Sequence, residues 1–104
     1  MPTIASTPAP HRYDPLPPDV LAAALRELPG WHGDTRRIAR TVEPDDMWTL
    51  LERVAAAEAD LDHHTVVDLD AGTVTFAVWT HVCDAVTAAD LELARRIDAV
   101  VDGA

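Results

Sequence analysis

The chain is poor in cysteine, in glycine and in positive charge. Its 104 residues include one cysteine, Cys83, so no disulfide can form within the chain, which fits a reducing cytoplasm. The 18 acidic residues outnumber the 8 basic ones and give a net charge of −10. This balance argues against a nucleic-acid partner and against binding to an anionic membrane. The 4 glycines form no phosphate-binding loop.

Long apolar runs are also missing. No segment approaches the roughly 20 apolar residues that a membrane-spanning helix needs. The N-terminus lacks the basic start and the apolar core of a signal peptide. We therefore expect a cytoplasmic protein that binds neither membranes nor nucleic acid.

The length predicts a single domain preceded by a short arm, since a typical domain has about 100–150 residues. Residues 1–16 carry four prolines and no hydrophobic periodicity, so we expect a flexible arm here and a folded domain over 17–104. Within the arm, His11, Arg12 and Tyr13 could dock on a neighbouring surface, although a disordered tail is the favoured interpretation.

Hydrophobic periodicity predicts helices that alternate with pairs of strands. In chain order we expect a helix, two strands, a helix, two strands and a helix, over residues 18–28, 31–33, 37–42, 44–61, 65–70, 73–80 and 87–103. Thr87 and Asp90 have the spacing of a capping box at the start of the last helix. Strands that arrive in pairs favour an antiparallel sheet. The predicted fold class is α+β, a four-stranded antiparallel sheet with three helices on one face.

Three histidines bracket the second strand pair. His63 and His64 precede its first strand and His81 follows its second, so antiparallel pairing brings all three imidazoles to one end of the hairpin. Imidazole is the side chain whose unperturbed pKa lies near neutral pH, so this cluster is a candidate acid–base site. One histidine could protonate a leaving hydroxyl while another removes a proton from the adjacent atom, which is an elimination of water.

The hairpin register predicts which imidazoles share a face. A two-residue turn between the strands, continued outward, places His64 beside Trp79 and His81, and it places Asp62 opposite His81. A bulge of one residue would bring His63 inward in place of His64. The convergence itself does not depend on this choice.

The neighbouring residues allow more than one interpretation. Asp62 or Asp90 could orient an imidazole ring, although Asp90 is favoured as a helix cap. Cys83 has no basic neighbour, so a half-buried thiol is favoured over a nucleophile. Zinc is the chemical alternative, but adjacent strand residues such as His63 and His64 point to opposite faces and make poor joint ligands. We expect no metal.

Several short segments together match one known family. They are Leu28-Pro29-Gly30-Trp31, Val54-Ala55 leading into His63-His64, Thr80-His81, Val86-Thr87-Ala88-Ala89-Asp90-Leu91, Leu93-Ala94 and Ile97-Asp98. The spacing from the histidine pair to the third histidine matches without a gap. On the basis of these segments, the chain resembles the pterin-4a-carbinolamine dehydratases. The similarity extends over almost all of the chain from Leu16 to Asp98.

The resemblance implies the dehydration of 4a-hydroxytetrahydropterin to quinonoid dihydropterin, with no metal or cofactor. It implies that His63 and His81 are the acid–base pair at the 4a-hydroxyl, that His64 chiefly binds the pterin, and that Asp62 and Asp90 support the imidazoles. It also implies a homodimer whose sheets join, often doubled into a homotetramer. The residues then expected to bind the substrate are Asp62, Thr65, Thr80, Val82, Cys83 and Asp90.

Some positions depart from the family pattern. Thr65 replaces the proline that usually follows the histidine pair, Val67 replaces a frequent aromatic residue, and Asp84-Ala85 replaces Gly-Gly or Ala-Gly. An acidic residue is common four positions before the pair, where this chain has Ala59, with Glu58 one step away. These departures keep two alternatives open: a relative that dehydrates, isomerises or cyclises another small molecule, and a non-catalytic dimerisation module.

Overall fold

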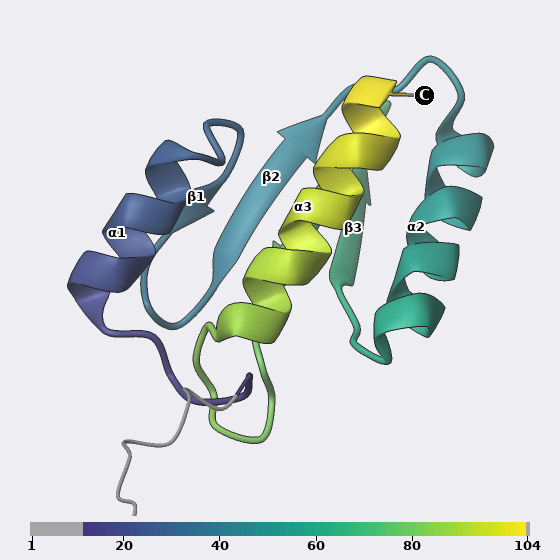
Figure 1. Ribbon diagram of the computed structural model, residues 1–104. Helices are drawn as coiled ribbons and strands as arrows, with labels where there is room; N and C mark the ends of the chain where they lie inside the picture. Colours follow the sequence, from purple (N-terminus) through teal and green to yellow (C-terminus); the bar gives the residue numbers. More distant parts are fainter. Residues whose placement is uncertain (1–11, 104) are drawn as a thin grey trace, which may run out of the picture.

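The computed structural model describes residues 12–103 and shows the predicted order of elements (Figure 1). The helices and strands are α1 (Pro18–Arg26), β1 (His32–Gly33), β2 (Ile38–Val42), α2 (Met47–Leu61), β3 (Val66–Asp70), β4 (Thr73–Val78) and α3 (Ala88–Gly103). The predicted α+β fold is confirmed. Helix α1 ends two residues earlier than predicted, because Glu27 caps it and the chain turns toward Pro29.

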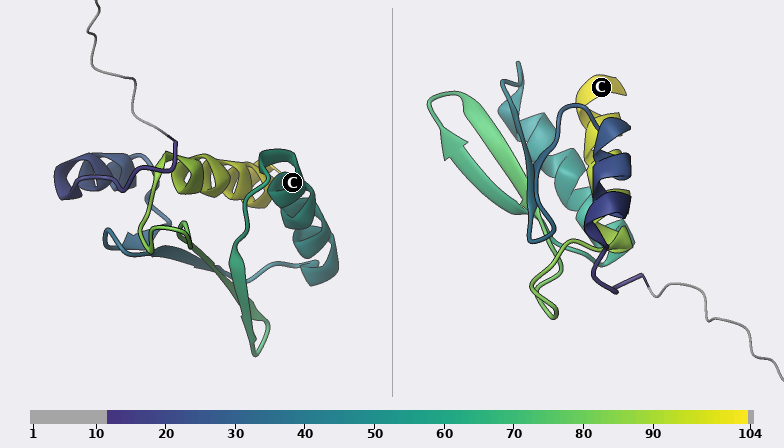
Figure 2. Two further views of the ribbon diagram at one scale, coloured as in Figure 1. Left: turned by 90° about the horizontal axis from the view of Figure 1, so that it is seen from below. Right: turned by 90° about the vertical axis from the view of Figure 1, so that its left-hand side faces the viewer.

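The four strands form one antiparallel sheet in the order β1-β2-β4-β3. Strand β4 pairs with β2 on one side and with β3 on the other, which leaves β3 at an edge of the sheet. The three helices cover the same face of the sheet, as the views in Figure 2 show, and the tip of the β3–β4 hairpin reaches beyond them.

Two tight turns fix the strand pairs. Ala71 and Gly72 have positive φ angles of 48° and 86°, as a two-residue hairpin turn of type I′ requires. Between β1 and β2, Gly33 has a φ of 145°, and a Cβ at this position would lie 2.2 Å from the carbonyl oxygen of Arg37. Glycine is therefore required at the second turn.

The hydrophobic core lies between the helices and the sheet. Every second side chain of β4 is fully buried, because strand residues alternate between the two faces. The large apolar side chains with complete burial are Phe76, Ile38, Leu93, Ile97, Val54, Val74, Val78 and Val86. Across residues 12–103, no helix has both the length and the apolar character needed to cross a membrane.

A polar contact joins the sheet to α3 beside this core. Asp98 accepts hydrogen bonds from Trp31 Nε1 at 2.8 Å and from Arg40 Nη1 at 2.5 Å. Burial lowers the pKa of Arg40, but hydrogen bonds with Asp98 and Asp102 outweigh this effect and raise the pKa above its ordinary value. The guanidinium therefore keeps its charge and its two carboxylate partners.

Helix α2 begins and ends at aspartates. Asp46 caps the first turn by accepting hydrogen bonds from Thr49 N at 3.1 Å and from Thr49 Oγ1 at 2.7 Å. These hydrogen bonds lower the pKa of Asp46. At the other end, Asp62 adopts a left-handed conformation with φ 49° and ψ 48°, and the helix stops just before the histidine pair.

Residues 12–16, the last part of the predicted arm, lie against the domain. The Arg12 carbonyl accepts a hydrogen bond from Ala89 N at 3.1 Å, and the Arg12 guanidinium lies 3.6 Å from the carboxylate of Glu92. Both partners belong to the first turns of α3. The earlier part of the arm, with His11, lies outside the described residues.

Candidate active site

All three histidines meet in one pocket of about 530 Å³, at the end of the sheet where β4 stops and β3 begins. The pocket wall consists of Tyr13, Asp62, His63, His64, Trp79, Thr80, His81 and Val82. The predicted convergence of the three imidazoles is confirmed. Two aromatic side chains, Tyr13 and Trp79, add apolar surface beside them.

The observed register of the β3–β4 hairpin matches the prediction along the whole of β3. The predicted continuation of this pairing to the residues before β3 is wrong. The paired ladder stops at Val66, so Asp62 does not lie in a strand opposite His81. The reason is the left-handed turn at Asp62, which ends α2 and redirects the chain before β3 starts. As a result His63 is the buried imidazole and His64 the exposed one, the exchange that a bulge was predicted to cause.

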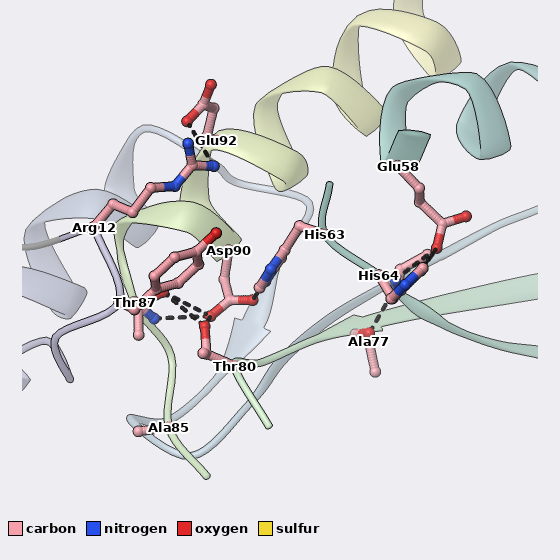
Figure 3. Close-up of polar contacts among 12 residues, drawn as sticks. Arg12, Glu58, His63, His64, Ala77, Thr80, Ala85, Thr87, Asp90 and Glu92 are labelled. Carbon is pink, nitrogen blue, oxygen red and sulfur yellow. Dashed lines mark hydrogen bonds and ion pairs between the residues drawn. The ribbon is translucent and has the colours of Figure 1, made fainter. Parts of the chain in front are cut away.

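A buried carboxylate holds the His63 ring. Asp90 has no exposed surface, and its Oδ1 lies 2.5 Å from His63 Nε2. Its Oδ2 accepts hydrogen bonds from Thr80 Oγ1 and from Thr87 N, each at 2.8 Å (Figure 3). The Thr87 contact is one half of the predicted capping box, so Asp90 both caps α3 and holds the ring. These donors compensate the cost of burying a polar group.

His64 lies at the surface, with 85% of its side chain exposed and Nδ1 3.7 Å from Glu58 Oε2. The same Glu58 oxygen accepts a hydrogen bond from Thr65 N at 2.9 Å. Thr65 Oγ1 in turn donates to the Ala77 carbonyl at 2.9 Å. Glu58 and Thr65 therefore fix the bend that connects α2 to β3 and carries the histidine pair.

Each of the other two imidazoles has an aromatic neighbour. The rings of His81 and Trp79 are stacked, with centroids 4.5 Å apart and an interplanar angle of 14°. The guanidinium carbon of Arg37 lies 4.4 Å from the centre of the Trp79 ring. Tyr13 stacks more loosely on His63, at 6.1 Å and 29°.

The residues predicted to bind the substrate divide into two groups. Asp62, Thr80 and Val82 lie in the pocket wall. Thr65 and Cys83 do not, and the Cys83 thiol instead faces backbone carbonyl oxygens at 3.6, 3.7 and 3.9 Å. Asp90, the sixth, lies behind His63 rather than in the wall.

Two positions that depart from the family pattern also lie outside the wall formed by residues 12–103. Val67 is on the edge strand β3 and is 40% exposed. Asp84 forms an exposed ion pair with Arg36 at 2.5 Å. Neither side chain narrows the pocket.

Sequence reasoning missed three contacts of the site. Tyr13 belongs to a proline-rich segment without periodicity, so nothing in the pattern placed it over His63. Arg37 lies beside Trp79 because β2 pairs with β4, whereas a strand register was predicted only for the hairpin of β3 and β4. Glu58 had a signal, because it is one step from the position where an acidic residue was expected.

The arrangement is suited to proton transfer, since one buried and two exposed imidazoles open into the same pocket. Among residues 12–103, no three His, Cys, Asp or Glu side chains come together in a way that would hold a metal ion.

The chain is similar to known proteins of one family. The family model described as Pterin 4 alpha carbinolamine dehydratase matches residues 14–100. A protein of Mycobacteroides abscessus is 40% identical over 86 residues, covering 80% of this chain and 92% of its own length. A protein of Nocardia farcinica is 37% identical over 86 residues (80% and 90%), and one of Streptomyces coelicolor is 36% identical over 94 residues (86% and 93%). All three are named "Putative pterin-4-alpha-carbinolamine dehydratase".

A solved structure from Brucella melitensis has the same fold, with a TM-score of 0.78 and 26% sequence identity. The similarity covers 85% of this chain and 99% of the other. That protein is described as a "transcriptional coactivator/pterin dehydratase".

Proposed function

The chain belongs to the pterin-4-alpha-carbinolamine dehydratase family, and from this we propose that it dehydrates 4a-hydroxytetrahydropterin to quinonoid dihydropterin. The family is one of dehydratases, so the chain is a lyase. The observation that carries the proposal is the presence of two imidazoles, His63 and His81, held in different ways in one pocket.

The proposed reaction needs two proton transfers. One imidazolium gives its proton to the 4a-hydroxyl, the bond between C4a and this oxygen breaks, and water leaves. The other imidazole, in its neutral form, takes the proton from N5, and the electrons released form the double bond between C4a and N5. His63 and His81 fill these two roles. General acid–base catalysis of this kind contributes about 10²- to 10⁴-fold to a rate.

Asp90 supports His63 in this mechanism. A carboxylate only accepts hydrogen bonds, so Nε2 of His63 donates to Asp90 and carries the proton. Nδ1 is then the nitrogen that faces the reaction. The contact therefore sets both the tautomer and the orientation of the ring.

Five of the remaining wall residues bind the substrate. Tyr13 provides an aromatic face for a flat heterocycle, and Val82, which is 97% exposed, adds apolar surface. His64 contacts the polar edge of the substrate from its exposed position. Asp62 and Thr80 provide oxygen atoms that can accept hydrogen bonds from ring N–H groups.

The chain also forms a homodimer through β3, or a homotetramer of two such dimers. Strand β3 is an edge of the sheet, and an edge strand exposes backbone groups that can pair with another chain. Val67 and Leu69 on this strand are 40% and 55% exposed. A second copy that adds its own β3 would pair these backbone groups and cover both side chains.

A turnover assay tests the proposed reaction. 4a-Hydroxytetrahydropterin is generated in solution, and its dehydration is followed by absorbance against the uncatalysed rate. We expect the wild-type protein to accelerate the reaction, His81→Ala to abolish the acceleration, and His63→Ala to reduce it by about 10²-fold. His32→Ala removes an exposed imidazole on β1 outside the pocket, and this control should keep the wild-type rate.

A folded wild-type protein that leaves the rate at its uncatalysed value would exclude the pterin reaction. The second candidate is then the same proton transfer on a different small molecule. The observation in its favour is that Val67 replaces a frequent aromatic of the family, while the pocket takes its aromatic surface from Tyr13 and Trp79.

A further inference from the structure

The two imidazoles assigned to proton transfer are held by different means. His63 is buried and hydrogen-bonded to Asp90. His81 is exposed, and within residues 12–103 its ring makes no hydrogen bond. Its ring contact is the stack on Trp79, with centroids 4.5 Å apart. An exposed imidazole without such a contact would move among several rotamers, and only some of them face the pocket.

The chain places Trp79 where it can stack on His81. The two residues are two positions apart just after β4, and residues two apart in an extended chain point to the same side. Trp79 directly follows Val78, the last residue of β4, so its backbone is attached to the sheet. Its side chain is half-buried, whereas Trp48 on α2 is 75% exposed.

The cation of Arg37, the residue just before β2, holds the indole. The guanidinium carbon of Arg37 lies 4.4 Å from the Trp79 ring centre, which is within the range of cation–π attraction. Ile38 and Val78 form the last pair of β2 and β4 at this end of the sheet. Arg37 directly precedes β2 and Trp79 directly follows β4, so this register, continued by one residue, brings the two side chains together.

We propose that Trp79 is a positioning residue for His81 and that Arg37 holds Trp79 in place. The proposal rests on the role of His81 in the proposed reaction. The stack restricts His81 to the rotamers in which its ring faces the pocket, as the hydrogen bond that His63 donates to Asp90 does for His63. A proton-transfer group that is displaced by about 1 Å can lose about 10²-fold in rate, so this restriction affects turnover.

Proton NMR of the imidazole rings tests the stack without any turnover. A stacked indole shifts the ring protons of His81 upfield, and His81→Ala identifies these resonances by their loss. At one fixed alkaline pH, Trp79→Leu should move them downfield to the position of an unstacked histidine. Arg37→Gln should move them part of the way, and Trp79→Phe should keep most of the upfield shift. Trp48→Leu, which removes the exposed tryptophan on α2, is the control and should change nothing.

Steady-state kinetics tests the consequence for catalysis. Trp79→Leu should lower kcat by about tenfold and change KM by less than about threefold, because the substrate still binds while His81 is misplaced. Trp79→Phe should recover most of kcat. Arg37→Gln should lower kcat by about threefold, while Arg96→Gln, which breaks a surface ion pair with Asp60, should leave it unchanged.

Two results would overturn the proposal. One is a set of His81 ring resonances that stay in place in Trp79→Leu, and this result counts whether or not the pterin is turned over. The other is a raised KM with unchanged kcat in Trp79→Leu, which would make Trp79 a substrate-binding residue instead.

Discussion

At the scale of single residues, Asp90 joins the start of a helix to the site. One carboxylate oxygen accepts from the backbone of Thr87 and from the hydroxyl of Thr80, and the other lies 2.5 Å from the His63 ring. The same side chain therefore caps α3 and fixes an imidazole. The two interpretations of Asp90 that the sequence left open describe one geometry.

Asp90→Asn should separate these two functions. The amide oxygen can still accept from Thr87 and Thr80, so the cap and the fold are kept. The amide nitrogen then faces His63 Nε2 as a donor and forces the other tautomer of the ring. We expect kcat to fall by about 10²-fold or more, with an unchanged circular dichroism spectrum. Asp60→Asn, a surface change on α2, is the control, and an unchanged kcat in Asp90→Asn would refute this role.

At the scale of elements, the first turn of α2 depends on a charged cap. The hydrogen bonds from the Thr49 side chain and backbone lower the pKa of Asp46 in the folded protein. An aspartate in the unfolded chain has a pKa of about 3.9. The stabilisation from Asp46 is therefore fully present above that value and is lost as the pH falls through the lower pKa of the folded state.

Thermal unfolding of Asp46→Asn across pH checks this sign. Asparagine also caps helices but does not titrate in this range. We expect the wild type to have the higher Tm at pH 6 and the difference to shrink as the pH falls below about 3.9. Asp45→Asn, the adjacent exposed change, is the control. A difference in Tm that does not vary with pH would contradict the assignment.

The contact between the sheet and α3 should matter for stability. Asp98→Ala leaves the indole N–H of Trp31 and the guanidinium of Arg40 without their shared acceptor, next to the core. We expect the free energy of unfolding to fall by about 2 kcal/mol in urea denaturation. The control Asp60→Ala removes the exposed pair with Arg96 and should cost less than about 1 kcal/mol. Equal effects of the two changes would contradict this account.

The β3–β4 hairpin shows which structural features local sequence patterns can predict. Its two-residue turn at Ala71-Gly72 determined the register of β3 and β4, because strand pairing repeats regularly from a turn. The extension to Asp62 was wrong because the left-handed end of α2 depends on how the chain leaves a helix, and periodicity carries no information on that. His63 faces inward through this turn and through the contact of its ring with the buried Asp90, which is 27 residues away in the sequence.

At the scale of the whole molecule, the free edge of the sheet predicts assembly. Sedimentation analysis should show an oligomer for the wild type and a shift toward monomer for Leu69→Glu, because the new charge lies on the edge strand. Val20→Glu places the same charge on α1 at a side chain that is 45% exposed, and it should keep the oligomer. A monomeric wild type would refute assembly through β3.

The order of elements and the convergence of the imidazoles were predictable because both follow from local spacing. The contacts of Tyr13 and Arg37 were not, because each joins segments whose approach depends on the complete fold. Tyr13 in particular belongs to a segment that carries no periodic signal, and it reaches the pocket through the backbone contact of its neighbour Arg12 with α3.

The pH dependence of kcat/KM for 4a-hydroxytetrahydropterin tests the central claim most directly. If one of His63 and His81 donates a proton to the substrate and the other accepts one from it, one ring must be protonated while the other must be neutral. The rate should therefore rise and then fall between about pH 5 and 8, the range in which imidazoles titrate. One limb of this profile should be lost in the residual rate of His63→Ala. A wild-type profile that is flat across the range would contradict histidine acid–base catalysis in this pocket.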